Sequence, residues 1–359
     1  MTKTHFYYPS VDGATQIHAI KWEPEGQPKG ILQIIHGMIE YIDRYDDFAC
    51  YMADHGYIVV GEDHLGHGES VQSDEYHGYF GRDGNAWVIA DIHQLRLMMA
   101  EAHPDLPYEM LGHSMGSFLL RQYITEKDAR YAEGLSGAIV MGTGWQPAAV
   151  LKLAKAIAKS QGTSAVGKSS RLLEVLAFGS YLKRIKKPNS ISDWLTRDEE
   201  IVRAYRRDPW CTFHFTPNGF YHTFAGMEAA HDIRRMAKLP AGLPILLCAG
   251  AEDPVGAWGE GVRKAFMVYS ENTPCQVDIK LYPDCRHEIL NELNRQEVYE
   301  DMLTFVEESI AAQSQVASGE SDPEMRGGGS GEASKQTDSS EPASGESSAD
   351  ITETTETTE

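Results

Sequence analysis

The stretch that most directly suggests chemistry is Gly-His-Ser-Met-Gly at residues 112–116, in which Ser114 stands between two glycines. A short apolar run, YEML, precedes it, and a helix-like sequence, SMGSFLLRQY, begins at once. A strand that turns sharply into a helix presents its serine hydroxyl, and glycines on either side allow the close backbone approach. The pattern predicts that Ser114 is a nucleophile. The alternative is a buried serine at the start of a helix.

A serine nucleophile needs a base to take its proton, and that base needs a third group to fix its tautomer. The chain has 14 histidines, so position must select among them. His287 follows the last predicted strand, VDIKLYPD, and precedes a helical segment; otherwise it is a surface or helix-capping histidine. Asp253 follows the strand LPILLCAG, although Glu252 competes with it and an aspartate before Pro254 also favours a turn. We predict the catalytic order Ser114, Asp253, His287.

A tetrahedral intermediate needs backbone donors for its oxyanion. One should be the N–H of Met115, directly after the nucleophile. The second should come from the loop HGMIE after the strand GILQII, where Gly37 allows a tight path and Met38 is the predicted donor. His36 is interpreted as a structural residue of that loop.

The elements that must position these residues follow from the apolar pattern. Branched-apolar runs at 30–37, 56–63, 108–114, 136–144, 243–250 and 277–284 alternate with helical patterns. Runs of this kind, bounded by Gly or Pro, are typical of strands covered on both faces, and the alternation predicts a doubly wound, mostly parallel sheet. HFYYPS and QIHAIKWEP predict an antiparallel hairpin at its edge. Ligands of such sheets bind beyond the carboxyl ends of the strands, where the three predicted catalytic residues fall.

The alternation divides the chain into three parts. Residues 1–143 and 244–313 form the predicted α/β core, and residues 144–243 form a helical cap inserted between two strands. From Ser314 onward the chain carries 11 acidic and two basic residues with very few apolar ones. We interpret 314–359 as a disordered acidic tail, either solubilising or partner-binding.

Composition is typical of a soluble intracellular protein. Of 359 residues, 42% are hydrophobic, which is enough for a sizeable core. Five cysteines without paired spacing argue against a disulfide framework or a zinc site. The N-terminal stretch has no apolar signal region, and the formal net charge is −21. We expect a cytoplasmic protein with no nucleic-acid partner and no obligate protein partner, and peripheral contact of its cap with an anionic membrane surface is left open.

The predicted cap reverses the overall charge. Residues 147–189 hold nine Lys or Arg and only one acidic residue, Glu174. In AAVLKLAKAIAKS, the lysines fall on one side of a helix and Val150, Leu153 and Ile157 on the other. Two interpretations stay open: the cap rests on an anionic membrane surface, or its apolar side covers the active-site cleft and the lysines are solvated. The aromatic segment DPWCTFHFTPNGFYHTF either lines the pocket or forms the core of the cap.

Five motifs, in order over residues 5–312, resemble the monoacylglycerol lipase and lysophospholipase group of α/β-hydrolases, also called serine aminopeptidase-like hydrolases. They are HGMIEYIDRY, EDHLGHGES, GHSMGS, EDPVG and CRHEILNE. The resemblance implies an α/β-hydrolase fold with a helical cap, and a scaffold role for Glu40, Arg44, Asp63 and residues 66–68 around the oxyanion loop. Tyr41 stands where that group often has histidine.

The sequence therefore predicts a serine ester hydrolase that acts on single-chain lipid esters through an acyl-enzyme and requires no metal or other cofactor. A soluble short-chain esterase and an amidase or peptidase of the same fold are alternatives. A non-catalytic binding protein is disfavoured, because such proteins usually lose the serine or the histidine.

Overall fold

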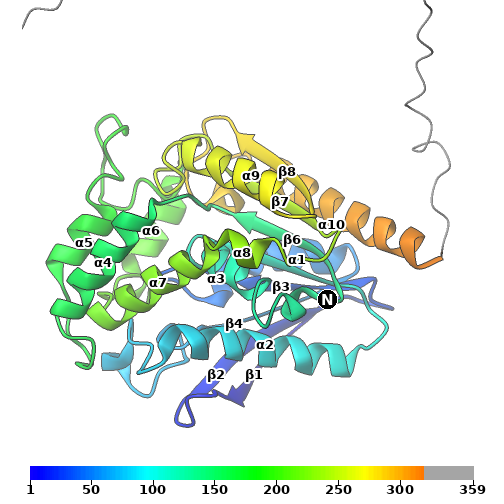
Figure 1. Cartoon of the computed structure of the whole chain (residues 1–359), viewed down its shortest axis with the longest axis horizontal. Helices are drawn as coiled ribbons and strands as arrows, with labels where there is room; N and C mark the ends of the chain where they lie inside the picture. The colour runs from blue at the N-terminus through cyan, green and yellow to red at the C-terminus, as the bar shows by residue number, and fades with distance from the viewer. Residues whose placement is uncertain (319–359) are drawn as a thin grey trace, which may run out of the picture.

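The computed structural model describes residues 1–318 and centres on one eight-stranded sheet (Figure 1). Its order is β1-β2-β4-β3-β5-β6-β7-β8. The strands are β1 (Thr2–Pro9), β2 (Gln16–Glu23), β3 (Gly30–Ile35), β4 (Tyr57–Glu62), β5 (Tyr108–His113), β6 (Leu135–Met141), β7 (Pro244–Gly250) and β8 (Gln276–Tyr282). Strands β3 to β8 pair in parallel, whereas β2 is antiparallel to both β1 and β4. The predicted doubly wound, mostly parallel sheet and its edge hairpin are confirmed.

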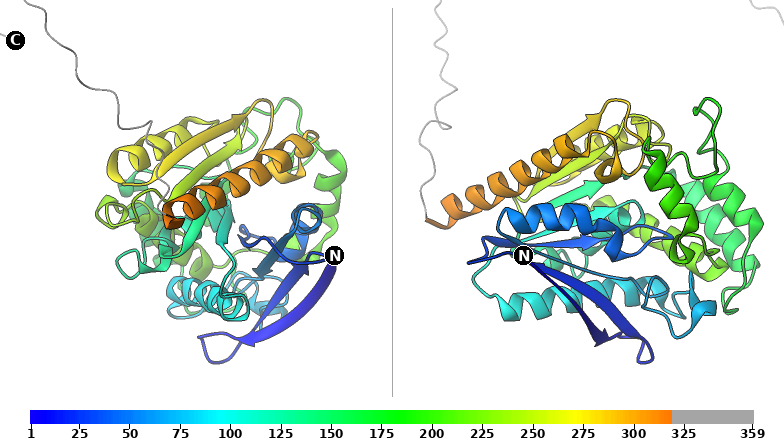
Figure 2. Two further views of the ribbon diagram at one scale, coloured as in Figure 1. Left: turned by 90° about the vertical axis from the view of Figure 1, so that its right-hand side faces the viewer. Right: turned by 180° about the vertical axis from the view of Figure 1, so that it is seen from behind.

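Helices cover both faces of the sheet (Figure 2). On one face lie α1 (Asp46–Asp54) and α10 (Arg295–Ser318), and on the other lie α2 (Gly84–Ala102), α3 (Met115–Tyr123) and α9 (Glu260–Asn272). Every residue of β3 to β7 is buried, which explains why these strands are continuous apolar runs rather than alternating ones. Short 3₁₀ turns complete the core: η1 (Ile42–Tyr45), η2 (Asp74–Tyr76), η3 (Arg130–Ala132) and η5 (Ile289–Asn291).

The chain between β6 and β7 forms the cap, which gathers at one end of the sheet (Figure 1). It contains α4 (Ala148–Ser160), α5 (Arg171–Phe178), α6 (Glu199–Arg207), η4 (Pro209–Cys211), α7 (Pro217–Ala230) and α8 (Ile233–Met236). Helix α7 packs against both α3 and α4. Within the aromatic segment, Phe215 and Phe220 are fully buried, and the Phe215 ring lies 5.5 Å from that of Phe80 in the core. The contact between the Phe215 and Phe80 rings therefore joins the cap to the core, and the buried Phe215 and Phe220 do not line an open pocket.

Helix α4 does not turn the expected side inward. Its buried residues are Leu151 and Ala158, whereas Val150 and Leu153 are 54% and 63% exposed. Ile157, the third residue of the predicted side, is half-buried and packs against the main core. The interpretation in which this side covers the cleft is therefore wrong for Val150 and Leu153. The inner contact is made by a second apolar stripe, and the periodicity does not decide which stripe faces the protein.

The last helix, α10, continues to Ser318, so residues 314–318 are helical rather than part of the tail. The rest of the predicted acidic tail, 319–359, lies outside the described residues. Among residues 1–318, none of the helices has the length and apolar character needed to cross a membrane.

Candidate active site

Ser114 lies in the sharp turn between β5 and α3. Its backbone has φ +54° and ψ −118°, a conformation that costs a non-glycine residue ~1–3 kcal/mol and that the surrounding structure must hold. A Cβ on Gly116 would lie 2.0 Å from the carbonyl oxygen of Ile35, and one on Gly112 would lie 2.3 Å from that of Gly116. Both glycines are required because β3, β5 and α3 converge here. The predicted elbow geometry is present.

His287 and Asp253 meet at the carboxyl ends of β8 and β7. Nδ1 of His287 lies 2.9 Å from Oδ2 of Asp253, and both side chains are buried. The other carboxylate oxygen, Oδ1, accepts a 2.8 Å hydrogen bond from the N–H of Val255, which fixes the carboxylate plane. The competitor Glu252 is exposed to solvent. The structure thus pairs His287 with Asp253 from segments 34 residues apart.

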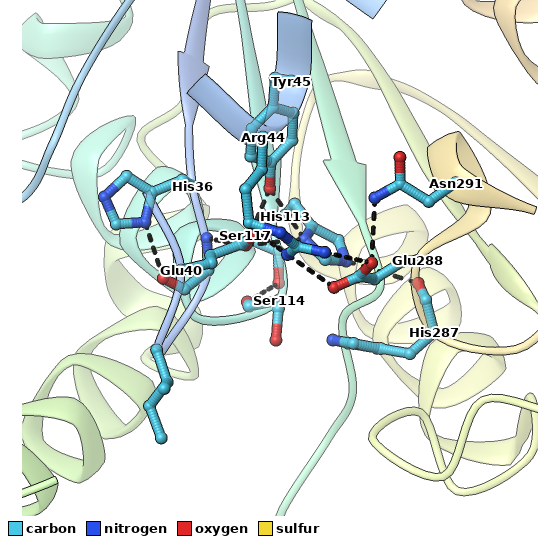
Figure 3. A network of polar contacts seen from close by, with 12 residues as sticks. His36, Glu40, Arg44, Tyr45, His113, Ser114, Ser117, His287, Glu288 and Asn291 are labelled. Atoms are coloured by element: carbon cyan, nitrogen blue, oxygen red, sulfur yellow. Dashed lines mark hydrogen bonds and ion pairs between the residues drawn. The ribbon is translucent and has the colours of Figure 1, made fainter. Parts of the chain in front are cut away.

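His287 extends toward Ser114 in the site (Figure 3). Space for its ring depends on Gly142, which follows β6: a Cβ there would approach His287 Cε1 to 3.2 Å. The N–H of Ser114 donates to the carbonyl of Met141, 3.0 Å away, and so fastens the nucleophile turn to β6. The carboxyl ends of β5, β7 and β8 therefore supply the serine, the aspartate and the histidine, and β6 lies between β5 and β7.

The predicted oxyanion loop passes directly over Ser114. A Cβ on Gly37 would lie 3.0 Å from Ser114 Cβ and 2.4 Å from Glu40 Oε1. The N–H of Gly37 donates to that same oxygen at 2.5 Å, and Ile39 adopts φ +58° to close the turn. Met38 lies between these two fixed residues, and Met115 is the first residue of α3. Both predicted donors are thus on backbone segments held close to the nucleophile.

A buried network of charged side chains connects the predicted oxyanion loop after β3 with the loop after β8 that carries His287 (Figure 3). The guanidinium of Arg44 contacts Glu40 at 2.7 Å and both carboxylate oxygens of Glu288 at 2.8 Å. Glu288 directly follows His287. His113 Nδ1 lies 3.2 Å from Glu40 Oε1, and its Nε2 lies 3.4 Å from the carbonyl oxygen of His287. These contacts connect the loop after β3 with the loop that carries His287.

The ionisation of this network follows from its pairing. Burial alone raises the pKa of Glu40, but the His113 hydrogen bond and the Arg44 charge outweigh it and hold that pKa well below its usual range. Burial lowers the pKa of His113, and the Glu40 carboxylate more than reverses this. Arg44 likewise overcomes the burial of Glu288 and lowers its pKa. The network therefore places two carboxylates around the Arg44 guanidinium and beside His113, and these pairings offset the cost of burying charge.

A second set of histidines supports the oxyanion loop without facing the nucleophile. The N–H of His64 donates to His36 Nε2 at 2.9 Å, and the two rings stack with centroids 4.0 Å apart. Burial lowers the pKa of His67 to about 3 and that of His36 well below its usual range, so both are neutral. Asp63 accepts hydrogen bonds from the N–H groups of Ile42 and Glu69, at 2.8 and 3.0 Å. These contacts match the scaffold role that the resemblance implies.

Tyr41, the departure from the expected pattern, points to the cap. Its hydroxyl donates to Asp208 at 2.7 Å, and its ring meets that of Trp210 edge-on at 5.0 Å. A tyrosine here therefore connects the oxyanion loop to the segment that follows α6.

Cap residues that the sequence does not indicate contact His287. The N–H of His287 donates to the carbonyl of Trp194, 3.4 Å away, and the two rings lie 5.0 Å apart. The N–H of Glu288 donates to the carbonyl of Leu195 at 2.7 Å. Trp194 lies in a stretch without a motif or clear periodicity, so its sequence carries no signal of this contact.

Comparison with known proteins decides the family. The family model described as "Serine aminopeptidase, S33" matches residues 26–294. The chain belongs to this family of hydrolases. The hydrolase is 29% identical over 306 residues to a monoacylglycerol lipase of Mycolicibacterium smegmatis, which covers 85% of this chain and 97% of that one. It is 25% identical over 302 residues to a monoglyceride lipase of Mus musculus, covering 81% and 86% of the two chains.

Solved structures agree with this placement. A thermostable carboxyl esterase from Bacillus coagulans superposes with a TM-score of 0.78 and 31% identity over 86% of this chain and 99% of that one. A structure described as the open form of a lipase gives a TM-score of 0.77 with 27% identity and the same coverage. The hydrolase therefore has the α/β-hydrolase fold and is a serine ester hydrolase of the lipase and esterase type.

Proposed function

We propose that the hydrolase cleaves carboxylic esters of single-chain lipids, monoacylglycerols or lysophospholipids, through an acyl-enzyme on Ser114. The observation that carries this is the 2.9 Å pair of His287 and Asp253 at the strand ends beside the serine turn. The similarity to monoacylglycerol lipases supports the substrate class. Each of these lipids carries one acyl chain, so the cap needs to accommodate only one.

The proposed reaction uses the geometry in two halves. Ser114 Oγ attacks the ester carbonyl while His287 Nε2 takes its proton, and Asp253 stabilises the resulting imidazolium through Nδ1. The N–H groups of Met38 and Met115 stabilise the oxyanion. Collapse breaks the bond to the alcohol, which leaves with the proton from His287. Water then attacks the acyl-serine with His287 again as base, and the fatty acid leaves as Ser114 recovers its proton.

The first experiment compares the wild type with Ser114→Ala on a p-nitrophenyl ester series from acetate to palmitate. We expect the variant to lose ~10⁴-fold or more in kcat. Asp253→Asn should also lose most of its activity, whereas its matched neighbour Glu252→Gln should retain wild-type rates. A fluorophosphonate should label the peptide that contains Ser114. An unlabelled wild type would overturn the proposed chemistry, and preference for acetate over long chains would replace the lipid substrate with a short-chain one.

Amide or peptide hydrolysis is the alternative that the family description allows. A p-nitroanilide with the same acyl group as the best ester tests it directly. We expect the ester to be hydrolysed far faster. A peptidase needs a free carboxylate to bind the amino group of its substrate, whereas the carboxylates of Glu40, Glu288 and Asp253 in the described site are already paired. Comparable rates on the two compounds would favour the amidase.

We further propose that the cap contacts anionic lipid surfaces. Five apolar side chains on α4 and α5 are more than half exposed: Val150, Leu153, Leu172, Val175 and Leu176. The basic residues around them include Lys152, Lys159, Arg171 and Lys183, all exposed. Apolar side chains ringed by cations suit an interface between headgroups and acyl chains.

Vesicle co-sedimentation tests this contact. We expect binding to phosphatidylcholine vesicles that contain phosphatidylglycerol, weaker binding without it, and a loss of roughly tenfold in Leu153→Ser, since burial of one leucine is worth ~1.5–3 kcal/mol. Leu97→Ser is the matched control, because Leu97 is 55% exposed on α2, away from the cap. Equal effects of the two substitutions would contradict a docking surface on the cap.

A further inference from the structure

Arg121, on the helix that begins at the nucleophile, is fully buried. Within residues 1–318 it forms no ion pair with a carboxylate. Its guanidinium instead donates to Thr143 Oγ1 at 3.1 Å, to the carbonyl of Gly144 at 3.0 Å and to that of Ala230 at 3.4 Å. Gly144 is where the chain leaves β6 for the cap, and Ala230 is the last residue of α7. One side chain of the core therefore reaches both ends of the segment that builds the inner cap.

Aromatic rings complete this contact. The guanidinium carbon lies 5.3 Å from the ring centroid of Trp145, the residue after Gly144. Directly after α7, the ring of His231 stacks on the same indole, with the ring centroids 4.0 Å apart and the planes at 19°. Trp145 thus contacts the core cation and the exit of α7 at once. We call Arg121, Trp145 and His231 the hinge clasp.

The charge of the clasp is compatible with its burial. A guanidinium without a carboxylate is costly to bury unless its donors are satisfied. Here the carbonyl at the end of α7 carries the negative pole of that helix, and the aromatic faces add cation–π attraction. Burial, with a contribution from Arg121, lowers the pKa of His231 to about 3. The imidazole is therefore neutral at physiological pH and places no second cation beside Arg121.

From this geometry we infer that Arg121 is a positioning residue that sets the orientation of the cap relative to Ser114, and through it the acceptance of long acyl chains. The argument rests on the proposed function, because it assumes that the cap accommodates the acyl chain. Arg121 follows Met115 by six residues, or ~9 Å along a helix. Helix α3 consequently carries Ser114 at its start, the predicted oxyanion donor Met115, and the side chain that contacts both the beginning of the cap and the end of α7.

Lysine cannot replace this arrangement. Its single ammonium group lacks the planar fork that reaches Gly144 and Ala230 together, and it stacks less well on an indole. Arg121→Lys should therefore keep the charge and loosen the cap. The matched control is Arg96→Lys. Arg96 on α2 is also buried, donates to the carbonyls of Tyr131 and Glu133 and covers the ring of Tyr108. Within residues 1–318, its hydrogen bonds and its cation–π contact all join it to the core and none to the cap.

The experiment measures kcat and KM of the full chain on p-nitrophenyl acetate and p-nitrophenyl laurate. For Arg121→Lys we expect acetate kcat to stay within about threefold of wild type and laurate kcat/KM to fall about tenfold or more, the loss expected for charged hydrogen bonds that orient a binding surface. Amide hydrogen exchange should rise in 144–150 and 226–236 and stay unchanged in 115–120. Arg96→Lys should change the two esters in equal proportion.

Equal losses on both esters, or faster exchange throughout the core, would reduce Arg121 to a stability residue and overturn the inference. If Arg121→Lys does not fold, Trp145→Leu removes the shared ring and is judged by the same two readouts. A wild type that hydrolyses neither ester would instead overturn the proposed function, and the exchange pattern in the hinge clasp would still decide the positioning role.

Discussion

The strand ends around Ser114 and the outer surface of the cap differ in which side chains they bury and which they expose to solvent. Around the nucleophile, charged groups are buried and paired: Arg44 and Glu288 have side chains only 10% and 4% exposed. On the cap, apolar groups are exposed: Leu153 and Val175 are 63% and 58% exposed. Polar groups in the interior are costly unless each finds a partner, and apolar groups outside bring no stability to the isolated chain.

This difference separates two tasks. The core site is rigid before substrate arrives, because its loops are connected by contacts that cannot be broken one at a time without leaving a buried charge. The outer cap keeps unused apolar surface that only an additional partner can cover. We therefore expect substitutions in the first region to change stability and catalysis together, and substitutions in the second to change neither in the absence of lipid.

The strongest test of the comparison is Arg44→Met. It leaves the carboxylates of Glu40 and Glu288 buried without their shared cation, which should cost ~3–5 kcal/mol of unfolding free energy. Urea unfolding followed by circular dichroism measures it. A double substitution that adds Glu288→Gln should recover part of the loss, because it removes one of the uncompensated charges. A loss below that of an ordinary surface substitution would show that solvent reaches the network.

Glu109 provides a second test, at a buried carboxylate that has no ion-pair partner among residues 1–318. Burial raises its pKa to about 8 from an ordinary value of 4.5, while a hydrogen bond from Ser309 partly opposes the shift. Between those two pH values the folded state holds one more proton than the unfolded state. Stability therefore falls as pH rises through this window, by up to ~1.4 kcal/mol per pH unit, and the slope ends above pH 8.

Glu109→Gln should remove this pH dependence. We expect the variant and the wild type to unfold at similar urea concentrations near pH 4.5, and the variant to be more stable by roughly 2–4 kcal/mol near pH 8. Unfolding curves at a series of pH values measure both slopes. If stability varies with pH in the same way for the two proteins, the pKa of Glu109 in the folded state equals its ordinary value.

The residues that could be predicted from the sequence are those whose position along a strand determines their position in space. Ser114 directly follows one strand, and Asp253 and His287 follow two others. The parallel arrangement of the sheet alone therefore brings all three to the side where the strands have their carboxyl ends. The requirement for glycine at 112 and 116 could also be predicted, because the backbone segments around Ser114 approach too closely for a side chain.

Other contacts depend on where distant segments settle and leave no local pattern. The bidentate pair of Arg44 and Glu288 joins residues 244 positions apart, and the hinge clasp joins α3 to both ends of the inner cap. The orientation of α4 is a third case. Its sequence contains two apolar stripes, and the contact with α7, including the ion pair of Lys155 with Glu228, selects the one with Leu151.

The smallest expected effect concerns Leu153, and it completes the comparison. Because its side chain is 63% exposed, Leu153→Ser should change the unfolding free energy by less than about 0.5 kcal/mol without lipid. Leu151→Ala on the same helix is the matched control: Leu151 is 2% exposed, and loss of a buried leucine costs ~2–5 kcal/mol. Thermal unfolding of both variants decides the point. If Leu153→Ser destabilises the lipid-free protein as much as Leu151→Ala, the outer side of α4 is covered in the folded chain, and its exposed leucines are not free to meet a lipid surface.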